Sequence, residues 1–335
     1  MTIRLIQTDP DFLDLKDEWN TLLNDSASHV PFLRHEYLYS WWKTLGGGEW
    51  EHGSLTILIE RDKNNKLIGI APLFLVDQQV MFLGTVEISD YLDLITAQDH
   101  LEEFIEAIFD FLTSNEFPEW QYLILDNLLE QSPTPQYIKK KTKDLGLIYS
   151  QQVIQPAPYL TLPKTWNEYL TDLEDRYRQE IERKIRKAEG YFLPVNWYIV
   201  KDEKTIHPEM ENFLELMRNN PDKNEFLSAA MSQHLISLAE IAFREGWLQL
   251  AFLTVGDLKV AGYLNFDFGN KIWVYNSGIN PLFENLSPGW VLLSYLIQWS
   301  IEAGKSEFDF MRGDEAYKYQ FGGINKNVLQ LKISK

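Results

Sequence analysis

Hydrophobic residues in the first 155 positions recur at helical spacing in some segments and alternate, or run continuously, in others. Helical spacing predicts one helix that starts after Asp9 or Asp11 and reaches about residue 23, and further helices at residues 33–45, 101–112 and 136–145. Strands are predicted at residues 4–7, 54–60, 67–76, 79–83, 122–126 and 147–153. These elements make up a complete mixed α/β unit.

A similar order of elements follows a segment rich in proline. Pro156, Pro158 and Pro163 resist both helix and central strand, so we expect a boundary there between two domains, residues 1–157 and 158–335. Beyond the boundary, helices are predicted at residues 166–173, 176–189, 208–217, 225–245 and 288–303. Strands are predicted at residues 247–255, 260–268, 271–277, 307–311 and 328–333. The shared order favours a duplicated architecture.

Composition limits the class of protein. A chain of 335 residues with 45% hydrophobic residues can bury two ordinary cores. The chain has no cysteine, so disulfides and thiolate chemistry are excluded, which fits a reducing compartment. No apolar run approaches the roughly 20 residues of a membrane helix. We therefore expect a cytoplasmic protein without membrane insertion.

Charge is distributed unevenly along the chain. The formal net charge of −18 repels phosphate backbones, so no nucleic-acid partner is expected. Residues 176–187 are the exception, with six basic residues and two acidic ones in one predicted helix. The apolar stripe of that helix contains Ile181 and Ile185 and leaves Arg176, Arg183 and Lys187 on another side. Arg183 is therefore a candidate for binding the phosphates of a ligand.

The segment from Leu286 to Trp290 is a candidate anion site at a helix start. Proline is favoured at the first helical position, as Pro288 is here, and Ser287 is a suitable cap. Free N–H groups and the helix dipole bind phosphate, and Gly289 lets a ligand approach the backbone. Leu286, Ser287, Gly289 and Trp290 are the predicted contacts. An ordinary capped helix explains the same residues without a ligand.

Polar residues gather around the strand at residues 307–311. Asp309 points away from the face that carries Phe308 and Phe310, and is a candidate base or anchor for an acceptor. Tyr317 is a candidate acid, because a phenol can give a proton to a leaving thiolate. Arg312 and Lys318 are candidate substrate contacts, although a structural ion pair between Asp309 and Arg312 is the simpler explanation.

Other residues carry weaker signals. Trp273 and Tyr275 either pack in the core or line a substrate pocket beside the candidate site. The six histidines show no metal-ligand spacing, so no metal site is expected, and His234 is predicted to lie on a helix surface. Asp93 is predicted to belong to a polar loop.

Several of these segments together resemble the GNAT acyltransferases of the CelD-like type, named for bacterial cellulose synthesis. The segments that carry the resemblance are Tyr159-Leu-Thr-Leu-Pro163, the basic helix at residues 178–187, Ser287-Pro-Gly289, Phe308-Asp-Phe310, Glu315-Ala-Tyr-Lys318, Ser89-Asp-Tyr-Leu-Asp93 and residues 32–42. The resemblance covers nearly the whole chain. It implies two tandem GNAT-like domains, each with a mixed, mostly antiparallel sheet flanked by helices, as in the Fem-type peptidyltransferases.

The resemblance also implies roles for residues of the second half. GNAT enzymes hold the pyrophosphate of an acyl-CoA at the start of the helix that follows their fourth strand, usually beneath an Arg/Gln-x-x-Gly-x-Gly/Ala loop. The matching segment here, Glu284-Asn-Leu-Ser-Pro-Gly289, has one glycine of that pattern and no Arg or Gln at its start. The family's tyrosine acid corresponds to Tyr317 or Tyr319. The first domain is expected to be degenerate.

Three functions remain open. The first is an N- or O-acyltransferase that uses acetyl-CoA or another acyl-CoA, without a metal, on a small-molecule acceptor such as an amine or a sugar. The second is a Fem-type aminoacyl transferase that uses a charged tRNA, for which a long helical hairpin is expected and not seen in the sequence. The third is a non-catalytic binding protein on the same fold.

Overall fold

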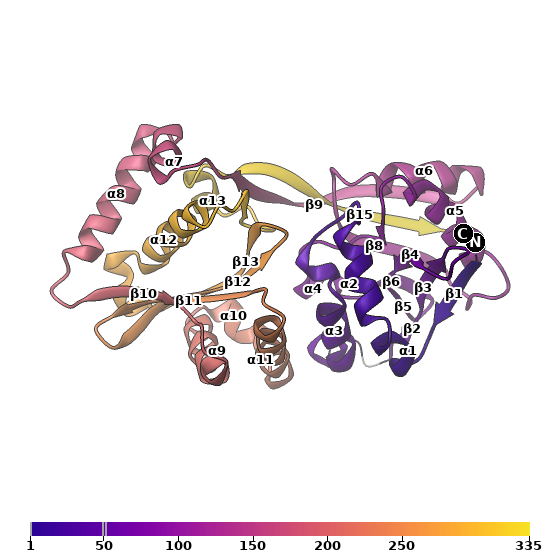
Figure 1. Cartoon of the computed structure of the whole chain (residues 1–335), viewed down its shortest axis with the longest axis horizontal. Helices are drawn as coiled ribbons and strands as arrows, with labels where there is room; N and C mark the ends of the chain where they lie inside the picture. Colours follow the sequence, from indigo (N-terminus) through magenta and orange to yellow (C-terminus); the bar gives the residue numbers. More distant parts are fainter. Residues whose placement is uncertain (1, 49, 51) are drawn as a thin grey trace. The chain divides into compact units, whose positions relative to one another are not determined.

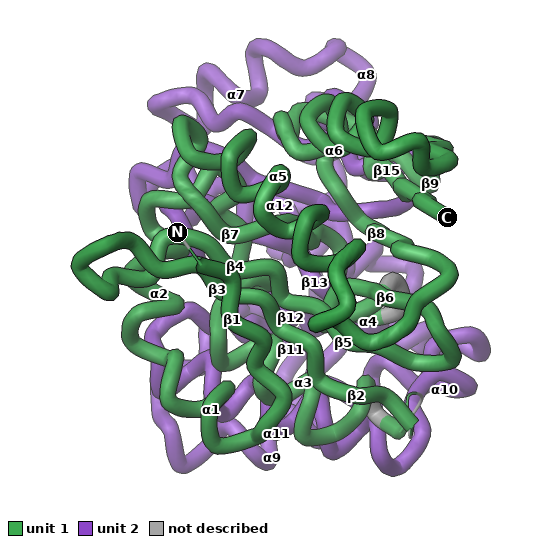
Figure 2. Tube along the Cα trace, turned by 90° about the vertical axis from the view of Figure 1, so that its right-hand side faces the viewer, with its two compact units in different colours: residues 1–156, 326–335 green, residues 157–325 purple. Residues whose placement is uncertain are grey.

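The structure, a computed structural model, describes residues 2–48, 50 and 52–335. The chain divides into two compact units, the first formed by residues 1–156 and 326–335 and the second by residues 157–325 (Figure 2). This division differs from the expected one in the last ten residues, which belong to the first unit. The chain therefore passes between the units twice, in strands β9 (Ile148–Thr161) and β15 (Ile324–Ser334).

The prediction that Pro156 and Pro158 resist a central strand was wrong, as strand β9 shows. This strand runs through both Pro156 and Pro158 to Thr161. Proline lacks an N–H donor but keeps its carbonyl acceptor. The Pro158 carbonyl accepts a hydrogen bond of 3.0 Å from the Phe310 amide, so proline is tolerated at this position of the strand.

The first unit contains two sheets. One has the antiparallel order β1-β3-β4-β7, and the other has the order β9-β15-β8-β6-β5-β2, in which β6 and β8 are parallel. The strands not yet given are β1 (Thr2–Ile6), β2 (Ser54–Leu55), β3 (Ile57–Arg61), β4 (Leu67–Ala71), β5 (Leu73–Val76), β6 (Gln79–Phe82), β7 (Ile95–Thr96) and β8 (Tyr122–Leu129). The helices are α1 (Asp9–Leu13), α2 (Lys16–Asn24), η1 (Pro31–Leu33), α3 (His35–Gly48), α4 (Thr85–Ile88), α5 (Leu101–Leu112) and α6 (Thr134–Asp144).

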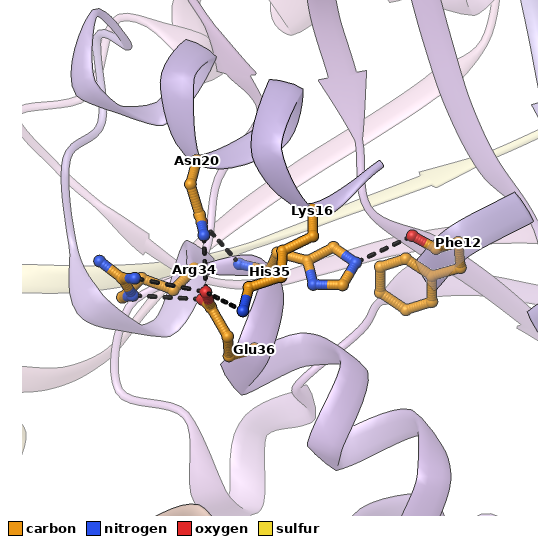
Figure 3. Close-up of polar contacts among 6 residues, drawn as sticks. All are labelled: Phe12, Lys16, Asn20, Arg34, His35 and Glu36. Atoms are coloured by element: carbon orange, nitrogen blue, oxygen red, sulfur yellow. Dashed lines mark hydrogen bonds and ion pairs between the residues drawn. The ribbon is translucent and has the colours of Figure 1, made fainter. Parts of the chain in front are cut away.

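A polar cluster joins α2 to the start of α3 in the first unit (Figure 3). The buried Glu36 carboxylate accepts a hydrogen bond of 2.8 Å from the Asn20 side chain and lies 3.3 Å from Arg34 Nε and 3.6 Å from Lys16 Nζ. The neighbouring His35 ring lies 2.8 Å from the Phe12 carbonyl. The charge of Glu36 is thus compensated within the unit, and the cluster holds two helices together.

Asp93 lies in the loop between α4 and β7, as predicted, and it is buried there. Its carboxylate accepts hydrogen bonds from the hydroxyls of Ser28, Ser132 and Thr134, the last two at 2.6 Å, and from the Leu94 amide at 2.8 Å. Four donors satisfy the carboxylate. Asp93 therefore joins three segments of the first unit.

The second unit has one sheet with the order β10-β11-β12-β13-β14 and the end of β9. All neighbours are antiparallel except β13 and β14. The new strands are β10 (Val195–Ile199), β11 (Leu248–Val255), β12 (Leu258–Phe268), β13 (Lys271–Ile279) and β14 (Glu307–Asp309). The helices are α7 (Trp166–Asp172), α8 (Asp175–Glu189), α9 (Glu203–Arg218), α10 (Pro221–Phe226), α11 (Ala229–Arg244), η2 (Pro281–Leu286), α12 (Pro288–Glu302) and α13 (Ala316–Gln320).

Helices cover both faces of this sheet. Helices α9, α10 and α11 lie on one face, and α12 with α8 lies on the other (Figure 1). Helix α9 packs closely because Gly278 of β13 has no side chain: a Cβ there would lie 2.6 Å from the Met217 amide nitrogen. The mixed α/β class with mostly antiparallel sheets flanked by helices is confirmed.

Three local predictions were wrong. Residues 225–245 do not form one helix, because the chain leaves the helix at Leu227 and Ser228 caps α11. Pro208 lies inside α9 rather than at its start. His234 is fully buried in α11 rather than on the helix surface. Among the described residues, no helix is long and apolar enough to cross a membrane.

Candidate functional site

The candidate site lies where β13 and β14 separate. The two strands pair only from Lys271–Trp273 to Glu307–Asp309, whereas β13 continues to Ile279. The pairing of β13 with β12 shifts between Val274 and Asn276, which leaves Tyr275 as an extra residue and bends the strand. Beyond the bend, the start of α12 lies beside β13: a Cβ on Gly289 would lie 2.6 Å from the Ile279 side chain.

A cavity of about 350 Å³ opens between these elements. Its walls include Ser277 and Ile279 of β13 and the first turn of α12, with Ser287, Gly289 and Trp290. The cavity is bordered further by Lys184 of α8 and Tyr317 of α13. The structure thus brings together three predicted contacts of the helix start with the predicted acid, and adds Lys184.

The helix start presents free amides without the predicted serine cap. Ser287 has left-handed backbone angles (φ 51°, ψ 53°), and its side chain makes no capping hydrogen bond. The helical bonds begin with the Val291 amide, which donates to the Ser287 carbonyl at 3.1 Å. The amides of Gly289 and Trp290 therefore have no acceptor within the helix. Leu286 is buried in the core and does not line the cavity.

Lys184, and not Arg183, is the basic residue of α8 at this cavity. Its Nζ lies 3.9 Å from the centre of the Trp290 ring and 3.5 Å from the Glu180 carboxylate. Burial lowers the pKa of Lys184, while Glu180 opposes that shift. Arg183 makes two hydrogen bonds of 2.8 Å to Glu180 and has a side chain that is 59% exposed. The predicted phosphate contact of Arg183 is thus not supported by its position.

Tyr317 lies at the cavity, and Tyr319 does not. The Tyr317 ring is partly buried and meets Phe310 edge-on, with 6.4 Å between the ring centres. Burial, and then the nearby Glu315 carboxylate, raise the pKa of Tyr317 well above its ordinary value. The phenol is therefore protonated at neutral pH. The Tyr319 hydroxyl instead lies 2.5 Å from the Asp314 carboxylate and 2.9 Å from the Asn325 side-chain oxygen.

Lys318 holds a turn rather than a substrate. Its ammonium lies 3.1, 2.6 and 3.3 Å from the carbonyl oxygens of Met311, Arg312 and Gly313, and 2.9 Å from the Glu315 carboxylate. The side chain is only 2% exposed. These contacts stabilise the turn, in which Met311 has a positive φ of 60°. The sequence could not show that these carbonyls converge on Lys318.

Asp309 and Arg312 belong to the same turn. Asp309 is fully buried, and its carboxylate accepts a hydrogen bond of 2.7 Å from the Met311 amide. Arg312 is partly buried, and its carbonyl is held by Lys318. Neither residue lines the cavity. Their predicted contact with the acceptor therefore has no support from the cavity's geometry.

The two aromatic candidates of β13 pack against the sheet. Trp273 is 1% exposed, and its indole donates a hydrogen bond of 3.0 Å to the Phe268 carbonyl. The Tyr275 ring lies 5.0 Å from the ring of Phe266. Both residues lie outside the cavity wall. Within the described residues, no group of three or more potential ligand side chains is arranged to hold a metal ion.

Several solved structures share the fold of the whole chain at low sequence identity. FemX has a TM-score of 0.66 and 13% identity over 99% of this chain and 97% of its own. A conserved protein from Bacteroides thetaiotaomicron has a TM-score of 0.62 and 10% identity over 99% and 100%. L-PGS from Bacillus licheniformis has a TM-score of 0.60 and 11% identity over 98% and 93%. No curated protein matches the sequence.

The family comparison concerns the second unit. The model of the acetyltransferase (GNAT) domain matches residues 175–319, a range that contains α8, the sheet from β10 to β14, α12 and Tyr317. The finer resemblance to the CelD-like type stays a prediction. Residues 175–319 thus match the acetyltransferase (GNAT) domain, in a chain whose fold is similar to that of FemX.

Proposed function

We propose that the cavity of the second unit catalyses acyl transfer from an acyl-CoA, with acetyl-CoA as the expected donor, to an amine or hydroxyl of a small molecule or sugar. The observation that supports this proposal is the placement of free helix-start amides, Lys184 and Tyr317 around one cavity. The first unit then acts as a degenerate companion domain.

The helix start fits the pyrophosphate of the donor. The amides of Gly289 and Trp290 point out of the first turn, where the helix dipole favours negative charge. Lys184 adds a positive charge at the Trp290 ring. Glu284 also lines the cavity, so we expect the phosphates on the Lys184 side. Backbone donors explain how the loop can bind phosphate without the usual Arg or Gln.

Tyr317 has the protonation state that the reaction requires. The acceptor nitrogen or oxygen attacks the thioester carbonyl carbon, the new bond forms as the carbon–sulfur bond breaks, and the electron pair stays on sulfur. Tyr317 gives its proton to that thiolate and becomes a phenolate. The proton that the acceptor loses then reprotonates Tyr317. Asp309 is left out of this scheme because its carboxylate is bound to the Met311 amide.

Thermal shift with acetyl-CoA and with free CoA tests the donor, because a ligand that binds only the folded protein raises its melting temperature. We expect both ligands to stabilise the protein and Gly289→Glu to abolish the shift, since the new side chain adds bulk and negative charge at the helix start. Thr171→Glu adds the same charge at an exposed position of α7 and is the matched control. No shift at millimolar ligand would overturn the proposal.

The fold favours aminoacyl transfer from a charged tRNA as a second candidate, because FemX and L-PGS are similar over nearly the whole chain. The net charge of −18 opposes tRNA binding. Parallel assays with acetyl-CoA and with aminoacyl-tRNA separate the candidates. Transfer from tRNA alone would replace the first proposal, and binding of CoA without turnover on any acceptor would indicate a non-catalytic protein.

A further inference from the structure

A second lysine, Lys223 of α10, lies beside the β13 wall of the cavity. Its Nζ donates hydrogen bonds of 2.8 Å to the Asn276 side-chain oxygen and 2.6 Å to the Ser277 carbonyl. Ser277 itself lines the cavity. The two hydrogen bonds fix the ammonium next to the site instead of leaving it free in solvent.

The charge of Lys223 has no carboxylate partner at ion-pair distance among the residues that the structure describes, and both of its hydrogen bonds go to neutral oxygens. Burial lowers the pKa of Lys223 to about 8, and only the more distant Glu315 carboxylate acts in the opposite direction. Withdrawing an ammonium from water without a counter-ion is unfavourable. An anion bound at this point would remove that cost.

The Glu315 carboxylate acts on both Lys223 and the proposed acid, Tyr317. It raises the pKa of both groups, so it lies within electrostatic reach of both side chains. Glu315 is itself paired with Lys318 at 2.9 Å. Lys184 of α8 lines the cavity, whereas Lys223 of α10, on the other face of the sheet (Figure 1), reaches it through its hydrogen bond to the carbonyl of the lining residue Ser277. Lys184 is already assigned to the donor's phosphates.

We propose that Lys223 binds an anionic group of the acyl acceptor, a carboxylate or a phosphate. The inference rests on the proposed acyl transfer at this cavity and narrows the acceptor to an amine or alcohol that also carries negative charge. The ammonium has a third N–H in addition to those given to Asn276 and Ser277, and that donor is available to the ligand. The acceptor's anion would also compensate the charge of Lys223.

Anion binding by the whole chain tests the proposal without any turnover. Sodium acetate and inorganic phosphate are the probes, titrated against the wild type, Lys223→Met and Lys223→Arg and followed by NMR of the lysine side chains. We expect Lys223→Met to lose roughly tenfold to hundredfold in affinity, as for a lost hydrogen bond to a charged group, and Lys223→Arg to retain most of it. Lys305→Met removes another partly buried lysine, which pairs with Asp267, and is the control.

Unchanged binding to Lys223→Met would overturn the proposal and leave Lys223 as a tie between α10 and β13. Loss of binding only in Lys184→Met would overturn it too, because the probe would then occupy the donor end of the cavity. If Lys223→Met does not fold, the wild type decides: the Lys223 pKa of about 8 must rise when phosphate is added, and a constant value refutes the proposal.

The CoA thermal shift keeps the two proposals distinguishable. Lys223→Met should retain the wild-type shift with acetyl-CoA. If the wild type binds acetate or phosphate through Lys223 but shows no CoA shift, the acyl-CoA proposal fails while the anion site stands. If CoA binds normally and no anion binds through Lys223, the anion-site proposal fails while the acyl-CoA proposal stands.

Discussion

Tyr317 combines a place at the cavity with a protonated phenol. Its pKa is raised first by burial and then by Glu315, and both causes disfavour the phenolate. Tyr319, two residues further on, points to Asp314 and Asn325 instead. The two tyrosines therefore form a matched pair of the same residue type in one short helix.

Tyr317→Phe should lower acetyl transfer by about 10²- to 10⁴-fold, the usual contribution of a general acid, while the acetyl-CoA thermal shift persists. Tyr319→Phe should keep nearly full activity. Steady-state release of free thiol measures both variants. Equal activity of Tyr317→Phe and the wild type would remove Tyr317 from the acid role.

His234 makes the second unit sensitive to acid. Burial lowers its pKa to about 4, against about 6.5 in an unfolded chain. Between these values only the unfolded chain takes up the proton, so stability is lost as the pH falls from 6.5 towards 4, by about 3 kcal/mol. His234→Gln should flatten this part of the profile of melting temperature against pH. Equal slopes for His234→Gln and the wild type would contradict the prediction.

The types of residue at the candidate site were predictable from the sequence, but the exact residues often were not. The sequence pointed to a basic helix and a glycine helix start, and the structure places both at the cavity. It could not separate Lys184 from Arg183, which differ by about 100° around the helix. Lys318 and Lys223 are harder still, because their partners are backbone carbonyls whose convergence depends on the tertiary fold.

At the scale of elements, helix α9 packs directly against the backbone of β13. Gly278 faces the α9 backbone, which cannot move as a flexible side chain would. Gly278→Ala should destabilise the second unit by about 1–3 kcal/mol and reduce the acetyl-CoA shift, because a displaced β13 moves Ser277 and Ile279 of the cavity wall. Thermal melts with and without acetyl-CoA measure both effects. Ser277→Ala, which adds no atoms, is the control for stability. If Gly278→Ala is as stable as the wild type, α9 can move away from β13 at little cost in free energy, and the prediction is wrong.

Most long elements were predictable from periodicity, and short or mixed ones were not. The residue range of α5 was predicted as it is observed. Strand β10 was missed, because its five residues lie at an edge of the sheet and are mostly half-buried. The prolines of β9 pointed to a linker, since a proline pattern does not show which N–H groups the sheet needs.

The whole molecule is joined by strands that belong partly to each unit. Leu331 of β15 is fully buried and pairs with Leu125 of β8 in the first unit. Leu331→Asp should destabilise the first unit by about 3 kcal/mol or more, because a carboxylate would enter its core. Hydrogen–deuterium exchange should then show lost protection in β8 and unchanged protection in β11 and β12. Lys332→Asp on the exposed side is the control, and loss in both units would contradict this division.

The return of residues 326–335 to the first unit has a consequence for synthesis. A ribosome releases the chain from its amino end, so residues 157–325 emerge before the strand that completes the first unit. The second unit can therefore fold while the first still lacks a strand beside β8. Until that strand arrives, β8 presents an open edge that a chaperone or another nascent chain can occupy. Residues 326–335, which are translated after the second unit, thus decide when the first unit becomes complete.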